Sequence, residues 1–193
     1  RAVGGGTDEI DGAFPVVGIG ASAGGLEAFT ALIAVLAVDT GMAFVAVSHL
    51  DPTHASGLSD ILARSTPMPV IEILDGQVIA PNTIYVLPPG RDLTIEGTRL
   101  VLQPRAAGVL HRPIDLFFRS LAEERRHHAI GVVLSGTATD GTLGVRAIKG
   151  AGGITFAQDD SARQTSMPHS AIADGFVDFV LPPHAIGAEL VRI

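Results

Sequence analysis

Short apolar runs alternate along this chain with longer stretches in which apolar residues recur every three or four positions. The short runs predict strands and the longer stretches predict helices. The predicted strands are 14–19, 42–47, 70–74, 84–87, 92–95, 99–102, 129–134, 154–157 and 176–180. The predicted helices are 26–38, 57–64, 114–126, 141–151, 170–174 and 184–192.

The strands predicted outside 84–102 are mainly continuous apolar runs rather than alternating ones, which indicates burial on both faces, as in a parallel sheet covered by helices. We therefore predict an α/β fold, a three-layer α/β/α sandwich with a mainly parallel, Rossmann-like sheet and right-handed crossovers. The region 84–102 differs, because Glu96-Gly97-Thr98 between two alternating runs is typical of a hairpin turn. All three strands of this region are predicted to form a small antiparallel patch.

Composition narrows the class of protein. The 193 residues fit one domain, and a hydrophobic content of 47% excludes a disordered chain. The Gly-rich, polar residues 1–13 are predicted to be a linker or a disordered N-terminal segment, and 14–193 the folded domain. Because the chain does not begin with Met, we interpret it as part of a longer protein.

Three classes of function are disfavoured. The absence of cysteine excludes a disulfide framework, a cysteine-ligated zinc site and a thiol nucleophile. No apolar run approaches ~18 residues, so direct membrane insertion is not expected. The net charge of −7 and the lack of a basic stripe argue against a nucleic-acid partner.

The loop after the first predicted strand offers a nucleophile. Gly20-Ala21-Ser22-Ala23-Gly24 fits the Gly-x-Ser-x-Gly turn, in which a sharp bend exposes the serine oxygen. The amide of Ala23 would then point to where an oxyanion forms. The same stretch, read as Gly18-x-Gly20-x-x-Ala23, also matches a dinucleotide-binding fingerprint. The spacing alone leaves a nucleophile and a phosphate-binding loop equally open.

Two other strand ends carry complementary groups. His49 directly follows the second strand and is suited to act as a general base. Asp140 lies in the loop after the strand 129–134, where it could orient a histidine or cap the next helix. Backbone N–H groups near Thr137 could supply a second oxyanion donor. A metal site formed by His49, Asp51 and His54 is a weaker alternative, because its spacing matches no justified ligand pattern.

Several motifs together carry a family resemblance. They are Gly-Ile-Gly-Ala-Ser-Ala-Gly-Gly at 18–25, Ser-His-Leu at 48–50, Tyr-Val-Leu-Pro-Pro-Gly at 85–90, His-Arg-Pro at 111–113 with Asp115, Leu-Ser-Gly-Thr-Ala-Thr-Asp-Gly at 134–141, Ala-Gln-Asp at 157–159 and Met-Pro at 167–168. From 16 to 193 the chain resembles the catalytic domain of the protein-glutamate methylesterase of bacterial chemotaxis. The resemblance implies that 14–193 is a methylesterase catalytic domain.

The resemblance also implies roles. Ser22 corresponds to the nucleophile of the family, His49 to its base and Asp140 to its acid, with Ala23 and Thr137 as oxyanion donors. The implied reaction is hydrolysis of glutamate γ-methyl esters on methyl-accepting chemoreceptors, together with deamidation of receptor glutamines. No metal and no organic cofactor is implied, and the implied location is cytoplasmic.

The chain departs from the family pattern near the nucleophile. Ala23 stands where the family often has threonine, Thr137 where it has methionine, and Ala138-Thr139 where it usually has Gly-Asn. The stretch 51–75 resembles proteins in which the methylesterase is fused to a methyltransferase. We therefore expect a fused or associated methyltransferase and a regulatory domain as partners.

Other functions stay open at this point. They are a general serine carboxylesterase or amidase, a catalytically idle domain that binds a receptor or a partner enzyme, and a nucleotide-binding module. The motif residues His111 and Arg112 could contact substrate or could serve only the start of the helix behind Pro113.

Overall fold

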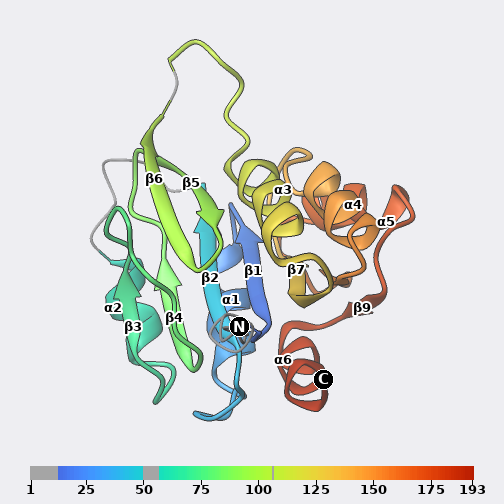
Figure 1. Cartoon of the computed structure of the whole chain (residues 1–193). Coiled ribbons are helices and arrows are strands. Elements are labelled where there is room, and N and C mark those ends of the chain that lie inside the picture. Colours follow the sequence, from blue (N-terminus) through green and yellow to red (C-terminus); the bar gives the residue numbers. More distant parts are fainter. Residues whose placement is uncertain (1–12, 50–56, 106) are drawn as a thin grey trace, which may run out of the picture.

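The computed structural model describes residues 13–49, 57–105 and 107–193. Its strands are β1 Val16–Ala21, β2 Ala43–Ser48, β3 Val70–Glu72, β4 Thr83–Val86, β5 Arg91–Glu96, β6 Arg99–Pro104, β7 Ala129–Val133, β8 Ile154–Gln158 and β9 Phe179–Leu181. Seven of them form one parallel sheet in the order β3-β4-β2-β1-β7-β8-β9, and β5 pairs with β6 as an antiparallel hairpin (Figure 1).

Helices cover both faces of the sheet. They are α1 Gly25–Ile33, α2 Leu58–Ala63, α3 Pro113–Arg125, α4 Thr142–Gly150, α5 Ser166–Ala173 and α6 Pro183–Arg192, with the 3₁₀ turn η2 at Arg126–His128. One core packs α1, α2 and α6 against the sheet, and the other packs α3, α4, α5 and the hairpin against the opposite face. The three-layer fold predicted from the sequence is confirmed.

Burial explains why the central strands are apolar throughout. All residues of β1 and of β7 are buried. The glycines of β1 face α3: a Cβ at Gly18 would lie 2.7 Å from Cε1 of Phe118, and one at Gly20 would lie 2.6 Å from Cγ2 of Ile114. These glycines let α3 lie close against the sheet. Helix packing therefore accounts for two positions of the dinucleotide-like pattern.

The antiparallel patch is smaller than predicted. Assigning 84–87 to it is wrong, because β4 lies between β2 and β3 and is parallel to both. All four residues of β4 are buried, which the central sheet requires. The predicted hairpin turn is confirmed: Glu96 pairs with Arg99, and Gly97 has a φ of 61°.

Three elements differ from their predicted bounds by three residues or more. The helix predicted for 26–38 ends at Ile33, where the chain turns back to bury Leu36. The helix predicted for 170–174 begins four residues earlier, at Ser166. Pro168 is compatible with this start, because it lies in the first turn, where a missing N–H costs no helical hydrogen bond. Instead of the predicted strand 176–180, the structure has the shorter strand β9, which begins at Phe179. Phe176 lies outside it, and its carbonyl accepts a hydrogen bond from the Thr155 side chain.

Within the described ranges, no helix is long and apolar enough to cross a membrane. Of the predicted N-terminal linker, residues 1–12 lie outside the described residues, so the boundary between linker and domain stays a prediction.

Candidate active site

The candidate site lies where the order of strands reverses. Along the chain, β1 is followed by β2 on one side, while β7 returns to pair with β1 on its other side. The carboxyl ends of these three neighbouring strands meet at one edge, the usual place for ligand and catalytic sites in such sheets. Ser22 follows β1, His49 follows β2, and Asp140 lies between β7 and α4.

A tight turn holds Ser22 at the end of β1. The N–H of Ser22 donates to the carbonyl of Ser135 at 3.0 Å, and the N–H of Gly25 donates to the carbonyl of Ser22 at 2.9 Å. Gly24 has a φ of 74°, a conformation that favours glycine. A Cβ at Gly25 would lie 2.5 Å from that of Ala21. The glycines after Ser22 are therefore needed for the turn itself.

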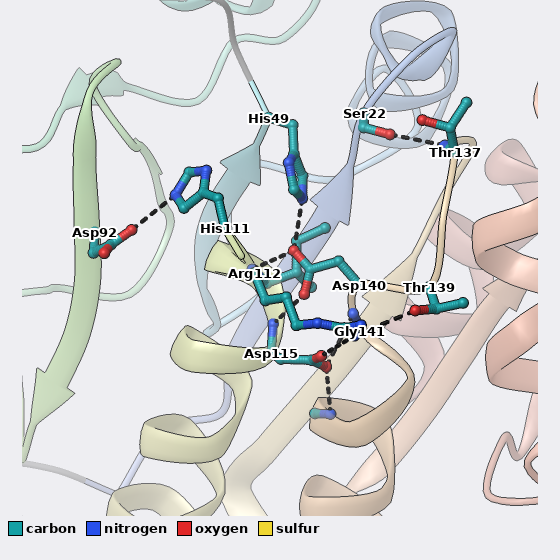
Figure 2. Close-up of polar contacts among 12 residues, drawn as sticks. Ser22, His49, Asp92, His111, Arg112, Asp115, Thr137, Thr139, Asp140 and Gly141 are labelled. Carbon is teal, nitrogen blue, oxygen red and sulfur yellow. Dashed lines mark hydrogen bonds and ion pairs between the residues drawn. The ribbon is translucent and has the colours of Figure 1, made fainter. Parts of the chain in front are cut away.

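The Ser22 hydroxyl oxygen accepts a hydrogen bond from the N–H of Thr137 at 3.0 Å, and Figure 2 shows it directed towards Thr137. Gly136 allows this approach, because a Cβ there would lie 2.5 Å from Oγ of Ser22. Ala23 is exposed, and its N–H donates to no described residue. Two backbone donors are thus close to the serine, one beside its oxygen and one on the next residue.

His49 and Asp140 form a short pair. Nε2 of His49 lies 2.6 Å from Oδ2 of Asp140, and 29% of the histidine side chain is exposed against 4% of the aspartate side chain (Figure 2). An ionised carboxylate only accepts hydrogen bonds, so Nε2 carries the proton of the neutral imidazole. The free lone pair, and with it the basic nitrogen, is therefore Nδ1.

Asp140 is fixed by the start of α3. Its two carboxylate oxygens accept the N–H groups of Ile114, at 3.0 Å, and Asp115, at 2.8 Å. In return, Oδ1 of Asp115 accepts the N–H groups of Gly141, at 3.0 Å, and Gly144, at 2.8 Å, at the start of α4. Asp140, which precedes α4 in the chain, therefore caps α3. Asp115, which lies in α3, caps α4.

Burial raises the pKa of Asp115, and the neighbouring Asp140 charge raises it further. The N–H groups of Gly144 and Gly141 and the Arg112 guanidinium act in the opposite direction. Nη1 of Arg112 lies 3.5 Å from Oδ2 of Asp115 and donates to Oγ1 of Thr139 at 3.2 Å. Arg112 thus ties the loop that carries Asp140 to the start of α3.

Among the described residues, no hydrogen bond joins Ser22 to His49. The strand register pairs Ala21 with Ser48, so Ser22 and His49 leave neighbouring strands at the same level. Adjacent strands are about 4.8 Å apart. The structure therefore brings together Ser22 with Thr137 and His49 with Asp140, and the Ser22 hydroxyl is turned to the backbone amide.

Sequence reasoning missed one residue beside the site. Asp92 on β5 accepts a hydrogen bond from His111, with Nε2 and Oδ1 2.9 Å apart, and the His111 and His49 rings lie with their centroids 5.6 Å apart. His111 stands out in the sequence through its motif. Nothing in the pattern singles out Asp92, because its closeness depends on how the hairpin packs on α3.

An apolar hollow of about 340 Å³ borders Ser22 on the side of α1 and α2. Its lining includes Leu26, Phe29, Leu58 and Ile61, and Arg163 also borders it. The exposed ion pair between Arg163 and Glu27, 3.3 Å long, lies at this hollow. The hollow offers apolar space beside Ser22.

Across the described ranges, no three His, Cys, Asp or Glu side chains are grouped as a metal site. Asp51 and His54 of the metal alternative lie outside the described residues.

The fold and the site are those of a Rossmann-like α/β domain with serine, histidine and aspartate at its switch point. The family model of the CheB methylesterase matches residues 17–190. The chain belongs to the CheB methylesterase family. The crystal structure of the CheB methylesterase catalytic domain of Thermotoga maritima superposes with a TM-score of 0.86 and 28% identity, covering 93% of this chain and 98% of that one.

Relatives of known sequence extend the comparison. A protein-glutamate methylesterase/protein-glutamine glutaminase of Cupriavidus pinatubonensis is 36% identical over 180 residues, 92% of this chain and 53% of that protein. One of Myxococcus xanthus is 35% identical over 184 residues, with the same coverage. An uncharacterized 104.1 kDa protein of Rhodobacter capsulatus is 46% identical over 131 residues, 67% of this chain and 14% of that protein. The chain spans about half the length of the two methylesterases it matches.

Proposed function

We propose that this chain is the catalytic domain of a protein-glutamate methylesterase. It hydrolyses glutamate γ-methyl esters on a methyl-accepting chemoreceptor or a similarly methylated protein, and it deamidates glutamines at the same site. Relatives that cover 92% of the chain bear the name of both activities. The observation that carries the proposal is the position of Ser22, on a tight turn between the Thr137 amide and the strand that His49 follows.

Acylation begins when the Ser22 hydroxyl turns from Thr137 to His49. Nδ1 of His49 takes the hydroxyl proton while Oγ attacks the ester carbonyl. The carbonyl oxygen, now negative, takes the place beside the Thr137 amide that Oγ has left, and the Ala23 amide is its second donor. Each such donor contributes roughly 3–4 kcal/mol in related reactions.

The remaining steps return the proton and release the acid. The protonated His49 gives its proton to the departing methoxide, so methanol leaves and a glutamyl ester of Ser22 remains. Water then gives a proton to Nδ1 of His49 and attacks this ester. As the bond between the acyl carbon and Oγ breaks, His49 returns the proton to Oγ of Ser22, which yields the free glutamate side chain and restores the serine hydroxyl. Asp140 holds the imidazole in one tautomer and stabilises its cation in both halves. With glutamine as substrate, ammonia leaves in place of methanol.

One observation favours a second candidate, a catalytically idle domain that binds a receptor or a partner enzyme. The Ser22 hydroxyl faces a backbone amide and makes no hydrogen bond to His49 among the described residues. An idle domain would keep this arrangement when substrate binds, whereas the esterase requires it to change.

Methanol release separates the two candidates. A receptor fragment carrying glutamate γ-methyl esters is incubated with the wild-type chain, with Ser22→Ala and with the control Ser65→Ala. Among the described residues, the Ser65 hydroxyl donates only to the carbonyl of Ile61 in the preceding helix. We expect methanol from the wild type and the control, and loss of at least 10³-fold in Ser22→Ala. A wild type that releases no more methanol than Ser22→Ala would establish the idle domain.

A further inference from the structure

We propose that His111, held by Asp92, is a positioning residue that fixes the ring plane of His49; this rests on the proposed function, in which His49 is the base. The hydrogen bond to Asp140 fixes the place of Nε2 and the backbone fixes Cβ, but the ring plane can still turn about the line from Cβ to Nε2. A second contact on the ring is needed to set the direction of Nδ1. His111 is the described side chain that meets the His49 ring in this way (Figure 2).

The two rings meet edge to face. Their centroids are 5.6 Å apart and their planes are inclined by 64°. This lies within the range of 4.5–7 Å and the T-shaped geometry that aromatic pairs prefer. Turning the His49 ring out of its plane would bring it against the His111 ring. The two contacts together therefore fix the ring plane, which the hydrogen bond to Asp140 alone does not.

His111 is itself fixed. Nε2 of His111 lies 2.9 Å from Oδ1 of Asp92, and the two side chains are 18% and 15% exposed. The carboxylate accepts, so Nε2 of His111 donates and the bond holds the ring in one orientation. The loop residues 107–110 that precede His111 are exposed, so the bond to Asp92 is needed to restrain the ring.

Asp92 lies on a strand that is clamped to α3. Its neighbour Leu93 is fully buried, and the N–H of Ile95 donates to Oγ of Ser120 on α3 at 3.1 Å. The N–H of Gly97, in the hairpin turn, donates to Oε2 of Glu124 at 2.8 Å. The hairpin thus carries a rigid chain of contacts from α3 through Asp92 and His111 to His49.

A structural role at the start of α3 would also use His111, so the test must read the base and not only the fold. We expect His111→Ala to lower kcat for methanol release by about 10- to 100-fold, the order of loss that a small misplacement of a reacting group causes. KM should stay within about twofold, because neither residue contacts substrate in the proposal. His111→Phe keeps the edge contact and should retain more kcat than His111→Ala.

Two further variants address Asp92. Asp92→Asn keeps an oxygen acceptor for His111 and should lie close to the wild type, whereas Asp92→Leu should lose kcat as His111→Ala does. The matched control is His169→Ala, which removes another histidine paired with an aspartate, 2.7 Å from Asp160 and largely exposed. This control should leave kcat and KM unchanged.

NMR of the His49 imidazole reads its ring orientation directly. In the wild type we expect one sharp set of His49 ring signals with the proton on Nε2, and in His111→Ala and Asp92→Leu ring signals broadened or doubled by exchange between ring orientations, with the His169→Ala spectrum unchanged at His49. If His111→Ala does not fold, His111→Phe and Asp92→Leu carry the comparison. Unchanged kcat and unchanged His49 signals in the folded variants would overturn the proposal. A wild type without activity would remove the proposed function, and the NMR comparison would still decide the positioning role.

Discussion

At the scale of single residues, the proposed oxyanion donors are backbone N–H groups. They therefore do not depend on which side chain stands at each position. Ala23 and Thr137 are two of the four positions where the sequence departs from the expected family pattern. The contact between Thr137 and Ser22 uses the backbone N–H, not the threonine side chain. The departures therefore leave the proposed oxyanion donors in place.

The Thr137 amide can be tested without the side chain. Thr137→Ala keeps the N–H and should leave kcat within about threefold of the wild type. Thr137→Pro removes the N–H, and we expect kcat for methanol release to fall by about 10²- to 10³-fold, the usual loss of one oxyanion donor. Far-UV circular dichroism and the melting temperature check that both variants fold. Equal kcat in the two variants would remove Thr137 from the reaction.

At the scale of elements, the reciprocal capping by Asp115 and Asp140 joins α3 to α4. Neither helix has a side-chain cap on its own preceding residue. The carboxylates cross over instead, so that each satisfies the free N–H groups of the other helix. The aspartate proposed to orient His49 is thus part of a helix junction, which restrains it more firmly than a loop alone would.

Loss of one cap should weaken that junction. Asp115→Ala leaves the buried N–H groups of Gly141 and Gly144 without their acceptor, and we expect the free energy of unfolding to fall by about 1–3 kcal/mol. Asp115→Asn keeps an oxygen acceptor and should lose less. Urea unfolding followed by circular dichroism measures both. An Asp115→Ala midpoint equal to that of the wild type would show that water replaces the lost acceptor.

The elements also show how far the sequence can lead. Continuous apolar runs predicted the buried strands, and strand ends predicted the loops of Ser22, His49 and Asp140. The strand order that makes those loops neighbours depends on pairing between distant segments, which no local pattern contains. For the same reason β4 was assigned to the wrong sheet and Asp92 was missed, since both depend on which surface the hairpin covers.

At the scale of the whole molecule, the chain corresponds to about half of the methylesterases it matches, and to 14% of the Rhodobacter capsulatus protein. A domain of this family thus occurs within a much longer protein. A fused or associated methyltransferase and a regulatory domain stay predictions for this chain. Mass spectrometry of the protein isolated from its source cells would test the fusion.

The free energy of unfolding of the whole domain should depend on pH through the titration of Asp115. Its pKa is raised from the ordinary 3.8, chiefly by burial, so folding favours its neutral form. Its contribution to stability is fully present below pH 3.8 and is lost as the pH rises through the raised value. The wild type should therefore lose stability relative to Asp115→Asn across that interval, with a constant difference above it. Urea unfolding over a pH series measures the difference, and a difference independent of pH would contradict the assignment.

The crossed caps have a consequence for how the domain is assembled. Asp115 precedes β7 in the chain and Asp140 follows it, so the crossed hydrogen bonds exist only while the starts of α3 and α4 lie together on the sheet. Amide hydrogens at Ile114 and Gly144 should then exchange with solvent together, as one cooperative unit. A chain in which this unit has opened has lost the placement of the aspartate proposed to orient His49, even where the rest of the sheet is intact.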